Sequence, residues 1–212
     1  TTLSMGAVTI TDARLLLIPI RSLRGVFAWV TSPLLLQRFT RDAQNASAVK
    51  ALPKVPVPAD DACLVAAGSA LKSNTEVILE DVPLKALDSD EVSAWAEWFE
   101  QTIFSGNQLG MSVGERLCIV PDDILIFLLE TATEVTARIR VDDEKKTVAE
   151  GALWYEEALP AETVLVSLVI AAYDGNEVFA SIQKTSERML QIGGKATVGR
   201  GLCKTTLVSE SK

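Results

Sequence analysis

The chain has 212 residues, of which 48% are hydrophobic, and a formal net charge of −8 at pH 7. This length and apolar content suffice for a buried core in one domain or in two small ones. The sequence contains no histidine, which excludes Ser-His-Asp, Cys-His and HExxH chemistry. The cysteines Cys63, Cys118 and Cys203 are far apart without CxxC spacing, so we expect free buried thiols rather than disulfides or a zinc site.

The charges are unevenly distributed along the chain. Residues 14–50 hold six cations against one acid, residues 184–204 hold five against one, and the segment between them carries 24 acids and eight bases. Two basic patches on an acidic body predict a surface that binds a polyanion, although surface cations are often merely solvated. The cations of the two basic segments are Arg14, Arg21, Arg24, Arg38, Arg41, Lys50, Lys184, Arg188, Lys195, Arg200 and Lys204.

No apolar run reaches the length of a membrane span, and the N-terminal residues lack a signal-peptide pattern. We therefore expect a cytoplasmic protein without a membrane partner.

The first predicted elements form a hairpin followed by a helix. Residues 9–21 and 26–31 are rich in β-branched and aliphatic side chains and are separated by turn residues. Ser32 is a favourable N-cap and Pro33 a favourable first helical residue, so a helix is predicted to about residue 45. The proline-containing stretch 46–62 has little periodicity, which indicates a surface loop or an insertion.

Two short strands, 62–67 and 76–82, precede a second helix. Asp88 and Glu91 have the spacing of a capping box. The apolar residues that follow, among them Trp95 and Phe99, fall on one helical face. Such a face is typical of core packing rather than of a stacking platform for bases.

The second half of the chain predicts a recognisable order of elements. If residues 135–155 form one hairpin, the underlying order is βαββαβ. We therefore expect an α+β fold with a ferredoxin-like, RNA-recognition-type sheet and an inserted hairpin. The predicted elements are strand 117–120, helix 121–134, strands 135–141, 148–155 and 163–172, helix 176–190 and strand 202–209.

A glycine-rich stretch lies between the last helix and the last strand. Gly193, Gly194, Gly199 and Gly201 accompany Lys195 and Arg200, a composition that lets the backbone approach a phosphate group while cations attract it. The alternative interpretation is a helix C-cap at Gly193 followed by a β-turn.

Three blocks of sequence resemble one family. The first is TDARLL, PIRSLRG and FAWVT between residues 11 and 31, followed by Pro33. The second is TARIRVDDE, GALWYEE and LPAET between residues 136 and 163, and the third is IGGKATVGRG at 192–201. In this order they are similar to the backbone subunit of type III-B CRISPR (Cmr) effector complexes, which belongs to the RAMP superfamily.

The resemblance implies one RAMP domain over residues 1–212, with an insertion around 46–115 and a thumb hairpin around 135–157. The family binds CRISPR guide RNA, assembles with copies of itself in a helical filament and with other Cmr subunits, and cuts paired single-stranded target RNA with Mg²⁺ or another divalent metal. Alternatives are a non-catalytic RNA-binding scaffold, another RAMP such as the type III-A backbone subunit or a guide-RNA-processing ribonuclease, and a ferredoxin-like interaction domain unrelated to RNA.

The resemblance also indicates candidate catalytic residues. The family's central acid follows its first strand, and we expect that segment to precede Thr1. Glu156 and Glu157 occupy the stretch of a supporting acid, with Ala158 where the family can carry tyrosine. In a strand only one of the two glutamates faces a cleft, and both could simply be solvated. No metal-ligand set is identified, because the acidic run 142–144 is typical of a solvated turn.

Candidate RNA-binding residues come from three segments. Arg21 and Arg24 flank a predicted turn, Arg138 and Arg140 share a face of the thumb strand, and Lys195 and Arg200 lie among the glycines. Arginine binds phosphate bidentately, which makes these cations candidate guide-RNA contacts. For Arg138 and Arg140 the alternative is cross-strand pairing with acids.

Overall fold

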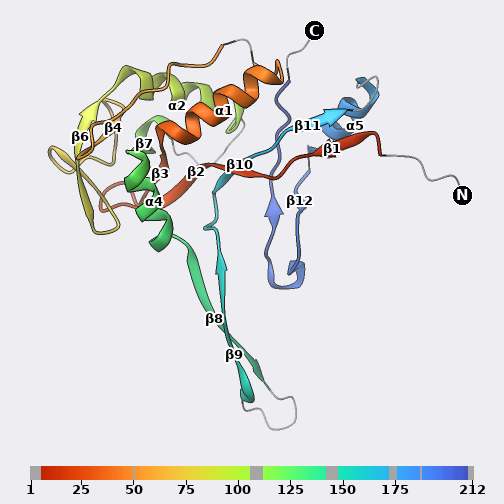
Figure 1. Cartoon of the computed structure of the whole chain (residues 1–212). Helices are drawn as coiled ribbons and strands as arrows, with labels where there is room; N and C mark the ends of the chain where they lie inside the picture. The colour runs from red at the N-terminus through yellow and green to blue at the C-terminus, as the bar shows by residue number, and fades with distance from the viewer. Residues whose placement is uncertain are drawn as a thin grey trace, which may run out of the picture.

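The computed structural model describes residues 6–49, 51–105, 112–141, 148–171, 176–186 and 188–209. Its largest feature is a seven-stranded mixed sheet in the order β10-β2-β3-β7-β4-β6-β5 (Figure 1). The pairs β3–β7 and β4–β6 are parallel, and the other neighbours are antiparallel. In sheet order the strands are Val164–Val166 (β10), Arg14–Arg21 (β2), Phe27–Thr31 (β3), Leu117–Ile119 (β7), Ala62–Val65 (β4), Val82–Asp88 (β6) and Glu76–Leu79 (β5).

Helices cover both faces of this sheet. Helices α1 (Pro33–Asn45) and α2 (Asp90–Thr102) pack on one face in a cluster that contains Trp29 and Trp95. Helix α4 (Asp122–Thr131) contributes Leu125 to a second cluster on the other face. A short helix, α3 (Val113–Arg116), precedes β7. The core is therefore layered, with both clusters built from side chains of the same central strands.

The predicted helices are present, but two of them end earlier than expected: the helix predicted to residue 134 ends at Thr131, and the one predicted to residue 190 ends at Ser186, because Leu190 belongs to a strand. Helix α1 starts at Pro33 after Ser32, as expected. On α2 the predicted apolar face is confirmed, because Trp95 and Phe99 are fully buried. Its N-cap is Ser89 rather than Asp88, since the Ser89 hydroxyl accepts a hydrogen bond from the Val92 amide. Asp88 instead pairs with Lys72 at 2.7 Å.

The segment expected to be an insertion contributes to the core, and the described residues of 46–61, before the strand that begins at Ala62, lack regular structure, as expected of a loop. Strands β4, β5 and β6 lie in the main sheet, and α2 packs on it. Within 46–62, Leu52 and Val55 pack against the first cluster, and the Lys54 carbonyl accepts a hydrogen bond from the Trp95 indole at 3.0 Å. The prolines prevent a regular element here, but they do not prevent an extended segment from covering apolar surface.

Three two-stranded sheets lie outside the main sheet. Their strands are β8 (Glu134–Val141) with β9 (Val148–Ala158), β1 (Val8–Ile10) with β11 (Val169–Ala171), and β12 (Leu190–Gln191) with β13 (Leu202–Cys203). In Figure 1 the β8–β9 hairpin projects far from the sheet, and helix α5 (Asn176–Ser186) lies near β1 and β11. The described helices include none long and apolar enough to cross a membrane.

The α+β class is confirmed, but the expected βαββαβ order across 117–209 does not form one sheet. Strand β7 and β10 lie in the main sheet, whereas β13 pairs with β12 alone among the described residues. The predicted last strand, 202–209, is ordered as a strand only over Leu202–Cys203. It serves to close the glycine-rich loop, because Leu202 lies opposite Gln191.

Candidate nucleic-acid interface

The β8–β9 hairpin has two chemically different faces. Its register pairs Thr136 with Glu156 and Arg138 with Trp154, which places charged side chains on one face. On the opposite face, the pairs Ala137 with Tyr155 and Ile139 with Leu153 are apolar or aromatic, and the acid Glu157 lies at its base opposite Val135. Ile139, Leu153 and Tyr155 are all more than half exposed.

The glycine-rich loop is a closed and well-defined turn. Strands β12 and β13 pair at its base, and the Ile192 amide donates to the Gly201 carbonyl at 2.8 Å. Between them lies a short 3₁₀ helix, η1 (Ala196–Val198), with Lys195 and Gly199 in the left-handed region on either side. Helix α5 ends at Ser186, so the alternative of a helix C-cap at Gly193 is wrong.

At Gly201 a larger residue would clash with the rest of the loop, so glycine is required at this position. Its φ is +74°, and a Cβ there would lie 2.1 Å from the Ile192 carbonyl oxygen. Gly193 and Gly199 also have positive φ, but a Cβ at either would meet open space. Gly194 has neither constraint. Glycine is therefore required at Gly201 by the closure of the loop itself, and the approach of a phosphate to the other glycines stays a prediction.

The loop docks on the charged face of the hairpin through two ion pairs. Lys195 Nζ lies 2.8 Å from Glu156 Oε1, and Arg200 Nη1 lies 3.2 Å from Glu134 Oε2. Arg138 Nε lies 3.5 Å from the other oxygen of Glu156. Three cations that the sequence singled out in two separate segments thus surround the base of the hairpin.

Glu156 is the electrostatic centre of this cluster. Its side chain is only 13% exposed and accepts a hydrogen bond from the Trp154 indole at 3.0 Å. The Lys195 ammonium, with help from Trp154, lowers the pKa of Glu156 from 4.5 to about 2. At neutral pH the side chain is therefore a carboxylate held by cations, which makes it unsuited to general-acid work.

Glu157 lies on the other face of the hairpin. Its partner in register is Val135, and its carboxylate accepts a hydrogen bond from the Thr133 hydroxyl at 2.7 Å. The two glutamates therefore lie on opposite faces of the strand, and only Glu156 contacts the cations. Ala158, the next residue of β9, lies opposite Glu134.

The other candidate cations, Arg21, Arg24 and Arg140, make no described contact with this cluster. Arg21 forms a bidentate hydrogen-bonded ion pair with Glu80, which raises the pKa of the guanidinium. Arg24 and Arg140 are exposed and make no ion pair with the residues that the structure describes. For Arg138 the alternative of cross-strand pairing is also realised, because its Glu156 contact is diagonal across the hairpin.

The carboxylates of the cluster do not fit a divalent-metal site. Within the described ranges, no three histidine, cysteine or acidic residues are grouped so as to hold a metal ion. Both Glu156 oxygens already face cations, whereas Mg²⁺ prefers several free oxygen ligands. The acidic run 142–144 at the hairpin tip lies outside the described residues.

Two members of the cluster escaped sequence reasoning. Glu134 was placed at a helix end and Trp154 only within a family block, yet one binds Arg200 and the other Glu156. For Trp154 a signal existed, since residues two apart on a strand share a face. The Glu134 contact joins residues 66 positions apart, which no local pattern could indicate.

The chain is similar to known proteins over nearly its whole length. The sequence model of the RAMP superfamily matches residues 2–204. The chain belongs to the RAMP superfamily. It is also 36% identical over 209 residues to the CRISPR system Cmr endoribonuclease Cmr4 of Pyrococcus furiosus, covering 95% of this chain and 69% of that protein.

Solved structures agree with this RAMP assignment. The crystal structure of oligomeric Cmr4 from Pyrococcus furiosus matches with a TM-score of 0.73 and 31% identity, covering 94% of this chain and 72% of that one. A chain of the cryo-EM structure of the type III-B Cmr-beta complex bound to cognate target RNA matches with a TM-score of 0.69. That likeness, at 20% identity over 95% of this chain and 70% of that one, supports the fold alone.

Proposed function

We propose that this RAMP protein is a guide-RNA-binding backbone subunit of a type III-B CRISPR complex, which assembles with copies of itself and other Cmr subunits on the guide. In the assembled complex it cleaves target RNA. The observation that carries the proposal is the docking of the glycine-rich loop on the hairpin, because it gathers Arg138, Lys195 and Arg200 around two carboxylates at the hairpin base. The similarity to a Cmr endoribonuclease supports the same function.

The cluster suits a backbone contact rather than the reading of bases. Lys195 is 57% exposed despite its ion pair, so its remaining donors can reach a phosphate oxygen. A phosphate that approaches Lys195 competes with Glu156 for the same ammonium, which couples RNA binding to the position of the loop. Contacts of this kind are independent of sequence and weaken with salt.

Within this proposal Glu156 acts as a positioning residue that holds Lys195. The glutamate has no proton to give at neutral pH, since its pKa is about 2. Cations near a reacting phosphate would stabilise the charge that develops during 2′-hydroxyl attack. Glu157 is a weaker candidate, because its side chain binds Thr133 on the opposite face.

Divalent-metal dependence is part of the proposal, but none of the described carboxylates can be assigned as a metal ligand. We therefore assign no step to a metal. Cleavage of a complementary RNA by the assembled complex, measured with Mg²⁺ and then with EDTA, tests this part. Unchanged cleavage in EDTA would remove the metal from the proposal while leaving guide binding intact.

RNA binding is tested by fluorescence anisotropy with a labelled single-stranded RNA over a salt series. Lys195→Glu combined with Arg200→Glu should abolish most of the affinity and flatten the dependence on salt. The matched control is Lys85→Glu, an exposed cation on β6 near the far edge of the sheet. Unchanged affinity of the double variant, or wild-type binding without a salt dependence, would contradict the proposal.

A non-catalytic scaffold is the second candidate. It is favoured by the ion-paired state of Glu156, whose two carboxylate oxygens both face cations. The two functions differ in one measurement. A complex that binds guide and target but leaves the target uncut at every metal concentration would support the scaffold.

A further inference from the structure

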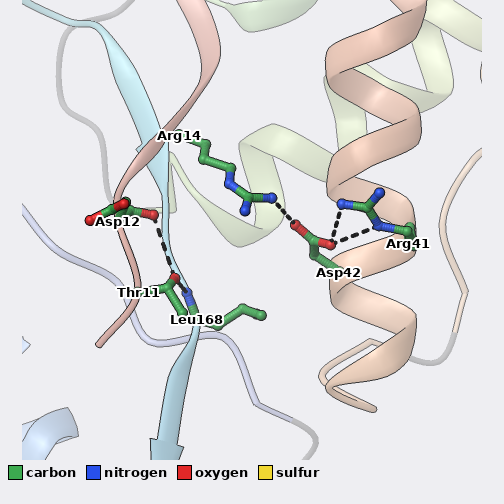
Figure 2. A network of polar contacts seen from close by, with 6 residues as sticks. All are labelled: Thr11, Asp12, Arg14, Arg41, Asp42 and Leu168. Atoms are coloured by element: carbon green, nitrogen blue, oxygen red, sulfur yellow. Dashed lines mark hydrogen bonds and ion pairs between the residues drawn. The ribbon is translucent and has the colours of Figure 1, made fainter. Parts of the chain in front are cut away.

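A second basic site lies apart from the hairpin and the glycine-rich loop. The start of β2, helix α1 and the connection between β10 and β11 enclose a pocket of about 160 Å³. Figure 2 shows the polar network at its rim. The lining residues that matter for its chemistry are Thr11, Asp12, Arg14, Arg41, Asp42 and Ser167.

Two guanidinium groups meet one carboxylate at this pocket. Arg14 Nη1 donates to Asp42 Oδ2 at 3.2 Å. Arg41 donates to Asp42 Oδ1 through Nε at 3.0 Å and through Nη2 at 2.9 Å. Both arginine side chains are more than half exposed, at 58% and 59%, whereas Asp42 is 21% exposed. One acid therefore holds two cations in place without neutralising both.

The second acid of the pocket, Asp12, does not neutralise the remaining positive charge of Arg14 and Arg41. In Figure 2 the Asp12 carboxylate points away from the two arginines, and its described hydrogen bond is made by the backbone carbonyl. The neighbouring wall is fixed by a reciprocal pair: Thr11 N donates to the Leu168 carbonyl at 3.0 Å, and Leu168 N donates to Thr11 Oγ1 at 2.9 Å. The side of the pocket formed by Thr11 and Leu168 is therefore fixed by these two hydrogen bonds.

Donors remain available at the pocket. Arg14 uses only Nη1 in its described contacts, which leaves the Nε and Nη2 edge that binds a phosphate bidentately. The exposed Ser167 hydroxyl makes no hydrogen bond with the residues that the structure describes. Exposed ion pairs contribute only about 0 to 1 kcal/mol to stability, so fold stability alone gives little reason for two arginines on one acid.

We propose that this pocket binds a phosphate group of single-stranded RNA, at a contact separate from the glycine-rich loop. The inference rests on the RNA-binding function proposed above and adds a second anchoring point to it. The volume of the pocket suits a single phosphate rather than a drug-sized ligand, for which pockets start at about 300 Å³. Exposed Arg38, one turn before Arg41 on α1, extends the basic surface as repeated phosphates require.

The proposal predicts opposite effects of two neighbouring substitutions. Arg14→Gln should weaken binding of a labelled single-stranded RNA about three- to tenfold and lower the salt slope by about one. Asp42→Asn should strengthen binding, because the RNA phosphate no longer competes with a carboxylate for the guanidiniums. Lys85→Gln, the same charge change near the opposite edge of the sheet, is the matched control and should change neither quantity.

The measurements separate the alternatives. Inorganic phosphate at millimolar concentration is titrated as a competitor: competition lost in Arg14→Gln confirms the pocket as the phosphate site. If the wild type binds RNA but Arg14→Gln keeps its affinity and slope, this inference is wrong and the proposed function stands. If the wild type binds no RNA, both fail. If Arg14→Gln alters only self-association, measured by light scattering without RNA, the pocket is a protein interface and the RNA proposal is overturned.

Discussion

The layered sheet buries large apolar side chains, whereas the projecting hairpin and the glycine-rich loop meet through charged groups. Trp29, Trp95 and Phe99 are fully buried between the sheet and its helices. On the hairpin, Trp154 is 44% exposed and Tyr155 69% exposed. The sheet is therefore held by apolar burial that ionic screening does not weaken, while the hairpin and loop depend on contacts that an anion or a change in pH can exchange.

The largest loss of stability should come from removing a large side chain from the core. Trp95→Ala should lower the free energy of unfolding by about 3–5 kcal/mol, because it removes a fully buried indole packed against its neighbours. Trp154→Ala on the hairpin is the comparison and should cost less than about 1 kcal/mol. Chemical denaturation measures both. Equal losses would mean that the hairpin belongs to the same cooperative unit as the sheet.

A smaller, local effect is expected at the base of the glycine-rich loop. Gly201→Ala places a methyl group against the Ile192 carbonyl and retains a positive φ, at a cost of about 1–3 kcal/mol in loop closure. Hydrogen exchange at the Ile192 amide, which donates to Gly201, should accelerate. Gly194→Ala is the matched control and should leave this exchange unchanged, since a Cβ there meets open space.

The ion pair between loop and hairpin should respond to acid. Glu156 has a pKa of about 2 in the folded protein against an ordinary value of 4.5. The contact therefore stabilises the docked loop above about pH 4.5, and this stabilisation is lost as the pH falls toward 2. Carboxyl ¹³C NMR of Glu156 follows the titration. In Lys195→Ala the pKa should rise toward 4.5, and an unchanged value would assign the shift to another group.

The smallest effects should come from the arginines at the β2–β3 turn. Arg21 is held by Glu80 in an exposed ion pair, so Arg21→Gln should change both stability and RNA affinity little. Arg24 makes no ion pair in the described part of the chain, and Arg24→Gln should reduce RNA affinity more. Anisotropy titrations compare the two variants. The reverse order would show that RNA displaces Glu80 from Arg21.

The sequence predicts best those elements whose signals are local. Pro33 after Ser32 marks the start of α1, and the spacing of Trp95 and Phe99 marks the buried face of α2. The α+β class and the RAMP resemblance were also accessible. What escaped was the strand order, because pairings such as β7 with β3 and β4 join segments far apart in the sequence. The extended stretch around Val55 looked like a loop because it lacks periodicity, although it covers the core.

The candidate site was predictable as a set of residues but not as an arrangement. The cations Lys195 and Arg200 and the four glycines around them stood out by composition. Their acidic partners, Glu156 and Glu134, depend on tertiary contacts across the hairpin base. Whether a cation is open to RNA or already paired is decided by such contacts, as the difference between Arg24 and Arg21 illustrates.

The pairing of β2 with β10 has a consequence for how the protein is made. Strand β2 gains β3 at once through a tight turn, but its other edge is completed only when Val164–Val166 has been synthesised. The Glu162 carbonyl, which accepts a hydrogen bond from the Trp29 indole at 3.2 Å, is synthesised equally late. During synthesis β2 is an open edge on a largely apolar strand, and such edges are prone to pair with other chains. Closure of this edge should be a late event in folding, governed by a long-range contact.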